Sequence, residues 1–231
     1  MDLIDEIKKF LKRSPIIYDL ALKIISPVCP LYRDYKILFR QLPGNARILN
    51  IGSGPKGLSG ANIVNIDLRK YRNVNIVGDA ASLPFSSSSF DGIVTIATLE
   101  HVRNITKVMS EIERVLRPTG LIYAVVPFMA GYHSSPFDYR RWTTEGVRDL
   151  FKRFEALKIG VAAGPTSAFL CIFQEWLAMV FSFNIKILYQ ILLIAFMILT
   201  FPLKFLDLLL SKYSFAKNIS YTFYFFGEKR R

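Results

Sequence analysis

The sequence predicts an α/β fold built on a mostly parallel sheet. Short apolar runs separated by turn residues recur between residues 46 and 127, and an amphipathic segment precedes the last of them. Continuous apolar runs suit parallel strands that helices cover on both faces. Residues 165–212 are strongly apolar, and we expect them to form a hydrophobic helical hairpin inserted before the last strand.

The chain is expected to begin with two or three short helices in residues 1–45. Prolines at 15, 27, 30 and 43 interrupt this segment. Its first helix has an apolar face opposite lysines. Such a face fits either packing on the next domain or a basic surface resting on anionic lipid.

Five strands follow, and turn residues separate them. We expect them at 47–51, 63–66, 74–77, 92–96 and 121–126. Between the last two, apolar residues at helical spacing predict a helix at 105–116, which Pro118-Thr119-Gly120 should end. A short helix at about 143–152, a strand at 154–161 and a final aromatic strand at 219–226 complete the prediction.

Composition excludes several classes of protein. The 231 residues are 52% hydrophobic, which argues against a disordered chain. Cys29 and Cys171 form no CxxC pair, so a disulfide scaffold is not expected. Only two histidines are present, so we expect no metal. The N-terminus lacks a signal-peptide core, and we expect residence in the cytoplasm.

A glycine turn and two aspartates carry the chemistry. Gly52-Ser53-Gly54 places flexible backbone at the carboxyl edge of the sheet, where a ligand can approach without meeting a Cβ. Asp67 ends the next strand and can accept hydrogen bonds from ribose hydroxyls. Asp79 ends the third strand, where it can hold an adenine amino group, and Ala80 leaves room for the ring. Each aspartate alone also suits a helix cap or a turn.

Four segments resemble the class I S-adenosylmethionine-dependent methyltransferases, and within them the type 11 group. They are ILNIGSGPKG, VNIDL, GDAASLPFSSSSFDGIVTIATLEHV and IERVLRPTGLIYAVVPF, within residues 46–163. The tail YTFYFFGEK resembles the last, antiparallel strand of that Rossmann-like fold. The resemblance implies S-adenosyl-L-methionine as cofactor. Gly52, Ser53 and Gly54 would face its methionine part, Asp67 its ribose, and Asp79 with Ala80 its adenine.

Two departures from the family pattern concern the methionine end. Asn50 stands where the family usually has an acidic residue near the methionine amino group, and Lys56 replaces the third glycine. Only 17 positions separate Asn50 from Asp67, so the helix after the first strand should be very short or absent. The string NIGSGP resembles methyltransferases of surface-polysaccharide pathways.

Candidate acceptor residues follow the fourth and fifth strands. His101 suits either a general base or a residue that shapes its loop. The stretch around His133, Asp138, Tyr139 and Arg140 resembles methyltransferases of sugar and polysaccharide pathways. The resemblance implies that it overhangs the acceptor, with His133 a second candidate base. His133 and Asp138 suit either contact with the acceptor or a role in shaping the loop. Arg140 and Arg141 suit a phosphate or carboxylate, or an ion pair with a nearby acid.

The domain organisation follows from these assignments. We expect N-terminal helices at 1–45, a methyltransferase domain at 46–164 and 218–231, and a membrane-associated helical insert at 165–217. A chain that returns to one sheet crosses a membrane twice or not at all. A span needs ~20 apolar residues. Only 17 uncharged positions separate Lys186 from Lys204, and Glu175 interrupts the preceding run.

Three arrangements of the insert therefore stay open. They are a hairpin in the cytoplasmic leaflet, two full spans, and a buried subdomain or oligomer interface. Flanking lysines at 158, 204, 212 and 217 place the ends on the cytoplasmic face of the membrane. Residues 1–45 and 165–231 together hold just over half of the net charge of +12. Because these segments flank the expected membrane contacts, this charge favours lipid headgroups over nucleic acid as its partner.

The leading hypothesis is a membrane-associated methyltransferase with a small-molecule or lipid-linked glycan acceptor, oxygen being the expected methylated atom. The rival is a non-catalytic membrane adaptor with a degenerate Rossmann-like domain. A nicotinamide dehydrogenase fits less well because Lys56 breaks the G-x-G-x-x-G pattern. The chain has no dense basic stripe, which argues against nucleic acid as a substrate.

Overall fold

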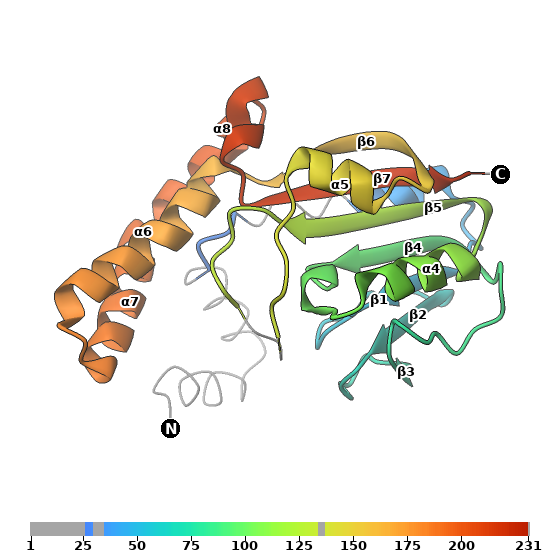
Figure 1. Ribbon diagram of the computed structural model, residues 1–231, viewed down its shortest axis with the longest axis horizontal. Helices are drawn as coiled ribbons and strands as arrows, with labels where there is room; N and C mark the ends of the chain where they lie inside the picture. Colours follow the sequence, from blue (N-terminus) through green and yellow to red (C-terminus); the bar gives the residue numbers. More distant parts are fainter. Residues whose placement is uncertain (1–25, 30–34, 134–136, 231) are drawn as a thin grey trace. The chain divides into compact units, whose positions relative to one another are not determined.

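The computed structural model describes residues 26–29, 35–133 and 137–230, which divide into two compact units (Figure 1). The sheet unit comprises Arg33–Phe128, Tyr132–Ala162 and Thr222–Arg231. Of the described residues, the helical unit comprises 26–29, Met129–Gly131 and Ala163–Tyr221. The amphipathic helix expected at the N-terminus lies outside the described residues.

The sheet unit is built on seven strands in the order β3-β2-β1-β4-β5-β7-β6. Strands β1 to β5 pair in parallel along this order, and β7 runs antiparallel to β5. This confirms the predicted mostly parallel sheet with an antiparallel last strand. The strands are β1 (Ile48–Ile51), β2 (Ile63–Asp67), β3 (Ile76–Val77), β4 (Phe90–Ile96), β5 (Leu116–Pro127), β6 (Phe154–Ala163) and β7 (Thr222–Lys229).

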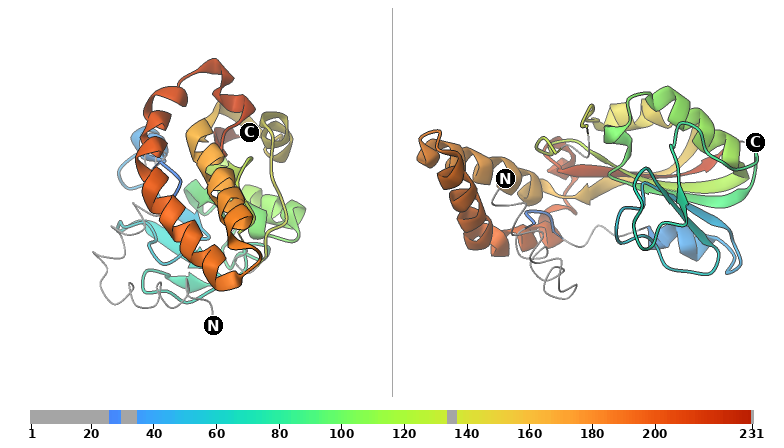
Figure 2. Two further views of the ribbon diagram at one scale, coloured as in Figure 1. Left: turned by 90° about the vertical axis from the view of Figure 1, so that its left-hand side faces the viewer. Right: turned by 90° about the horizontal axis from the view of Figure 1, so that it is seen from below.

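Helices cover both faces of this sheet. Helices α4 (Ile105–Val115) and α5 (Thr144–Leu150) lie on one face and α3 (Lys36–Gln41) lies on the other (Figure 2, right). Side chains alternate between the two cores because successive residues of a strand point to opposite faces. Phe223 and Phe225 of β7 join the core under α4 and α5, whereas Tyr224 and Phe226 join the core under α3.

Several element boundaries differ from the prediction. Strand β3 has only two residues. Helix α4 ends at Val115 and β5 begins at once, because Leu116 pairs with Phe90 before the register shifts to Gly92 and Leu121. The last strand begins at Thr222 rather than 219, since a 3-10 turn, η3 (Ser214–Asn218), leads into it.

The helical unit contains the predicted hairpin. Helix α6 (Pro165–Ser182) and helix α7 (Lys186–Thr200) lie side by side, joined by a tight turn with Phe183 and Asn184 in the left-handed conformation (Figure 2, left). Two short elements follow, η2 (Phe201–Leu206) and α8 (Asp207–Leu210). Asp207 caps α6 from a distance: its carboxylate accepts the backbone N–H groups of Thr166 and Ser167 at 2.8 and 2.9 Å.

Truncation of Phe225 should destabilise the sheet unit. This ring is 1% exposed and stacks on Phe151 with ring centres 4.2 Å apart. Phe225→Ala leaves a cavity and should lower the free energy of unfolding by about 3–5 kcal/mol. Urea unfolding followed by circular dichroism measures the loss. Phe137→Ala is the control: this ring is 58% exposed, and its removal should change stability by less than about 1 kcal/mol.

Candidate functional site

A cavity of about 410 Å³ opens where the strands β1, β2, β3 and β4 end. Their carboxyl ends meet at one edge because these strands are parallel, and ligands of open α/β sheets bind at this edge. The volume is in the range of small-molecule sites. Five of the expected cofactor residues line it: Gly52, Gly54, Asp67, Asp79 and Ala80.

The glycine turn after β1 requires residues without side chains. Gly52 and Gly54 have φ angles of 68° and 61°, in the left-handed region that favours glycine. A Cβ on Gly52 would lie 2.2 Å from Oγ1 of Thr98, which follows β4. A Cβ on Gly54 would meet nothing within 4 Å, so this position borders open space.

The two aspartates hold the rim of the cavity by backbone hydrogen bonds. Asp67 accepts the N–H of Gly54 at 2.8 Å and that of Arg69 at 2.9 Å, which ties the glycine turn to the end of β2. Oδ1 of Asp79 accepts the N–H of Ala81 at 2.8 Å, an Asx turn on an exposed residue. Each carboxylate oxygen keeps lone pairs for further donors.

Asn50 and Ser53 do not line this cavity. Asn50 is buried, and its Nδ2 donates to Oδ1 of Asn65 at 2.8 Å. The Asn65 amide also bonds the N–H and the carbonyl of Leu58, at 3.0 and 2.9 Å. Within the described residues, the Oγ of Ser53 is buried without a hydrogen-bond partner. The structure therefore places Asn50 in the support of the loop after β1.

These hydrogen bonds hold the loop between β1 and β2, where the helix was expected to be very short or absent. Residues 52–62 contain turns and no helix, as the sequence predicted. An acidic residue at position 50 would set a carboxylate oxygen against the side-chain amide oxygen Oδ1 of Asn65. Asparagine is able to donate there. The departure from the family pattern has a structural reason.

Asn50→Asp should therefore destabilise the protein. The substitution removes the donor and leaves two buried acceptors facing each other, at a cost of about 1–3 kcal/mol. Thermal unfolding at neutral pH measures the loss. The same substitution at Asn45, which is exposed, is the matched control. Equal stability of the two variants would show that the Asn50–Asn65 bond contributes nothing.

The loop after β5 is held mainly by its own charges. Asp138 receives two hydrogen bonds from the Arg141 guanidinium, at 2.5 and 2.7 Å, and the N–H of His133 at 2.9 Å. The Arg141 guanidinium holds the pKa of the Asp138 carboxyl well below its usual range. Arg140 donates to the carbonyls of Val102 and Arg103. These bonds favour a loop-shaping role for Asp138 and Arg140, whereas Tyr139 is 43% exposed.

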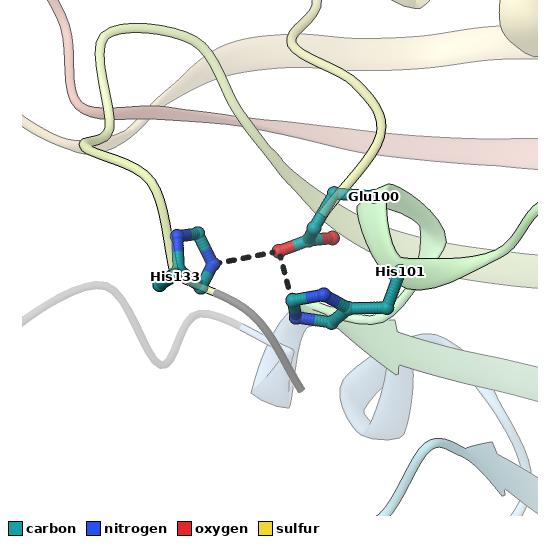
Figure 3. A group of neighbouring side chains, drawn as sticks. All are labelled: Glu100, His101 and His133. Carbon is teal, nitrogen blue, oxygen red and sulfur yellow. Dashed lines mark ion pairs between the residues drawn. The ribbon is translucent and has the colours of Figure 1, made fainter. Parts of the chain in front are cut away.

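The two candidate bases lie together around Glu100. The turn η1 (Leu99–His101) carries Glu100 and His101, and the loop after β5 brings His133 to them (Figure 3). Nε2 of His133 is 3.5 Å from Oε1 of Glu100, and Nε2 of His101 is 3.9 Å from it. The two imidazole rings meet edge to face with centroids 5.2 Å apart. His101 also lines the cavity.

Sequence reasoning missed other residues at this site. Thr98 and Tyr71 line the cavity without having been predicted, and Glu100 was not singled out. Position 98 could have been found, because it lies two residues after the end of a parallel strand, at the ligand-binding edge. The approach of His133 to Glu100 depends on a long loop, which leaves no periodic pattern in the sequence.

The strand order and the glycine-turn cavity define the Rossmann-like fold of class I methyltransferases. Residues 51–124, about a third of the chain, match the family described as a methyltransferase domain. The 1,6-didemethyltoxoflavin-N1-methyltransferase of Burkholderia thailandensis, solved with S-adenosylhomocysteine, has a similar fold. Its TM-score is 0.54 at 14% identity, covering 94% of this chain and 91% of that one.

Curated relatives are similar over shorter regions. The 24-methylenesterol C-methyltransferase 2 of Oryza sativa subsp. japonica is 32% identical in an alignment of 108 residues that covers 36% of this chain and 29% of that protein. The 2-phytyl-1,4-naphtoquinone methyltransferase of Synechocystis is 37% identical over 70 residues, 30% of this chain and 29% of that protein. The chain thus spans less than a third of the length of these relatives.

Proposed function

We propose that the chain is an S-adenosylmethionine-dependent methyltransferase that acts at the cytoplasmic face of a membrane. The observation that carries the first part is the cavity at the carboxyl ends of β1 to β4, with its glycine turn and two aspartates, inside the region that matches the methyltransferase domain. The named relatives are methyltransferases of a sterol and a quinone.

The residues at the cavity fit the cofactor. Open space at Gly54 leaves room for its methionine part, and the exposed Asp79 carboxylate suits an adenine amino group. Asp67 keeps lone pairs for ribose hydroxyls after bonding two backbone N–H groups. S-adenosylmethionine supplies a methyl group on an activated sulfonium, so the chain's own task is to hold acceptor and cofactor in line.

Asp79→Ala should weaken binding of S-adenosylmethionine by about ten- to a hundredfold, because it removes a hydrogen bond to a charged group. Isothermal titration calorimetry on the full chain in detergent measures the affinity. Asp149→Ala is the matched control, since this exposed aspartate of α5 lies outside the cavity and pairs with Lys152. Wild-type affinity in Asp79→Ala would contradict the adenine assignment.

The second part of the proposal, membrane association, rests on the reversed polarity of the α6–α7 hairpin. The side chains that point outward are large and apolar: Phe169, Ile172, Trp176, Met179, Val180, Phe181, Ile187, Ile191, Ile198 and Leu199. Polar side chains are buried instead, and Gln174 of α6 donates to Thr200 of α7 at 2.6 Å. A water-soluble hairpin has the opposite arrangement.

A hairpin with apolar side chains on the outside and polar side chains inside is suited to a lipid bilayer. The segment Lys186–Leu210 is long and apolar enough to cross a membrane, and 17% of its most apolar 18-residue stretch is buried. Among the described residues it is the one segment that meets this test, which favours a hairpin in one leaflet over two full spans. Lys212 and Lys217 follow α7, are exposed and suit anionic headgroups. Lys204, expected from the sequence to flank the membrane, is instead fully buried and donates to the carbonyl of Ser26.

The helical unit also carries an apolar groove of about 270 Å³. Its lining is almost wholly carbon: Met129, Pro165, Ala168, Phe169, Ile172, Phe173, Trp176 and Ile219. A groove of this kind suits an acyl or prenyl chain. We therefore propose a lipid-linked or membrane-proximal acceptor, including a lipid-linked glycan, with a hydroxyl oxygen as the methylated atom.

Charges on the outward face should release the protein from lipid. Trp176→Glu/Met179→Glu should lower binding to phosphatidylglycerol–phosphatidylethanolamine vesicles by more than about tenfold, because two large apolar side chains lose their burial in lipid. Vesicle flotation of the full chain measures the bound fraction. Val77→Glu/Leu157→Glu places the same charges on exposed apolar residues of the sheet unit and should float like wild type.

Salt separates the two contributions to this binding. Flotation that persists at high salt supports insertion of the apolar face, since headgroup attraction to lysines is screened. Wild-type protein that stays in solution with vesicles of either charge would contradict membrane association.

A non-catalytic membrane adaptor is the second candidate. Asn50 in place of an acidic residue and the missing helix after β1 favour it. Its support weakens because the Asn50–Asn65 bond explains the substitution structurally. Calorimetry distinguishes the two: an adaptor with a degenerate domain should give no heat with S-adenosylmethionine.

A further inference from the structure

The side chains of Glu100, His101 and His133 converge on one point (Figure 3). Each offers one ligand atom, and these atoms all lie within 4.8 Å of one another. The chain has two histidines, and both belong to this group. Two imidazoles and one carboxylate are a common set of protein ligands for catalytic zinc.

Glu100 is a buried carboxyl group without a hydrogen-bond partner among the described residues. The residue is fully buried, and within the described structure neither of its carboxyl oxygens makes a hydrogen bond. Leaving a buried carboxyl unsatisfied costs free energy, so such groups are paired or bind metal ions. Oε1 is the atom that faces both imidazoles.

The distances fit metal ligands better than a hydrogen-bonded chain. Oε1 of Glu100 is 3.5 Å from Nε2 of His133 and 3.9 Å from Nε2 of His101. Hydrogen bonds of this type are about 2.7–3.2 Å long. Two atoms that each lie about 2.0–2.1 Å from a zinc ion at a tetrahedral angle are about 3.4 Å apart.

The outer nitrogens of both rings face oxygen atoms. Nδ1 of His101 lies 2.5 Å from the carbonyl oxygen of Phe137, which can only accept, so Nδ1 carries the hydrogen. Nδ1 of His133 lies 3.7 Å from Oδ2 of Asp138, and Arg141 holds that carboxylate in place. Metal-binding histidines are oriented in this way, by an oxygen partner of the ring nitrogen that does not bind the metal.

We propose that Glu100, His101 and His133 bind one divalent transition-metal ion, for which zinc is the natural candidate. Imidazole ligands favour zinc over magnesium, which prefers oxygen. Three protein ligands leave a coordination position open. Because His101 lines the cavity, this position is available to an acceptor bound beside the cofactor.

The role of the ion rests on the proposed function. An acceptor hydroxyl in the open position becomes more acidic and releases its proton to water. Its oxygen then attacks the methyl carbon of the sulfonium: the O–C bond forms, the S–C bond breaks, and the electron pair stays on sulfur. The products are the methyl ether, S-adenosylhomocysteine and one proton.

Cobalt binding tests the site without any need for activity. The full chain in detergent, without a histidine tag and stripped with a chelator, is titrated with Co²⁺ and followed by visible absorption. Zn²⁺ is titrated by calorimetry. We expect one ion per chain, and Zn²⁺ should displace Co²⁺ while Mg²⁺ should not. Since the chain has no other histidine, an imidazole–cobalt spectrum can arise only here.

Two ligand variants and one matched control complete the experiment. Glu100→Gln and His133→Ala should each weaken Zn²⁺ binding by more than about tenfold. His133 is partly exposed, so its removal should leave the fold intact even where Glu100→Gln unfolds the protein. Glu113→Gln, on the exposed side of α4 against Arg153, should bind like wild type.

The outcomes separate this inference from the proposed function. Asp79→Ala should lose the cofactor and keep the metal, whereas His133→Ala should lose the metal and keep cofactor affinity within about threefold. Wild-type protein that binds neither Co²⁺ nor Zn²⁺ overturns the metal site even if it methylates. Binding that survives in His133→Ala also overturns it.

Discussion

The close approach of the β1 turn to the end of β4 is the constraint on which the site depends. Thr98 lies so near position 52 that only glycine fits between them. Asp67 then holds the same turn from the β2 side through the N–H of Gly54. The ends of β1, β2 and β4 are thus held together, and all three contribute residues to the lining of the cavity.

The chain achieves this without the helix that usually separates the first two strands of such a fold. The amide of Asn65 bonds both the N–H and the carbonyl of Leu58 and so takes the place of helical packing. Asn50 completes the group from β1. A polar network of three residues can hold a short loop, because every donor and acceptor in it that is buried has a partner.

The sequence predicted the sheet and most of the cavity, since both follow from local patterns. Apolar runs such as 92–96, and aspartates at strand ends such as Asp67 and Asp79, can be recognised from the sequence of their immediate neighbours. The start of β7 at Thr222 could not be predicted, because it depends on where the helical unit ends. Glu100 was not predicted as a site residue for a similar reason, because its neighbour His133 comes from a loop whose path only tertiary structure defines.

The reversed polarity of the hairpin has a consequence for how its sequence can change. In the lipid environment proposed above, hydrocarbon would impose no shape on the side chains that touch it, so outward positions such as Phe181 and Ile198 would tolerate any large apolar residue. Inward positions are different, because Gln174 and Thr200 must match each other in hydrogen bonding. Related hairpins should thus preserve their few polar residues and exchange their many apolar ones freely, the reverse of the variation seen in a water-soluble core.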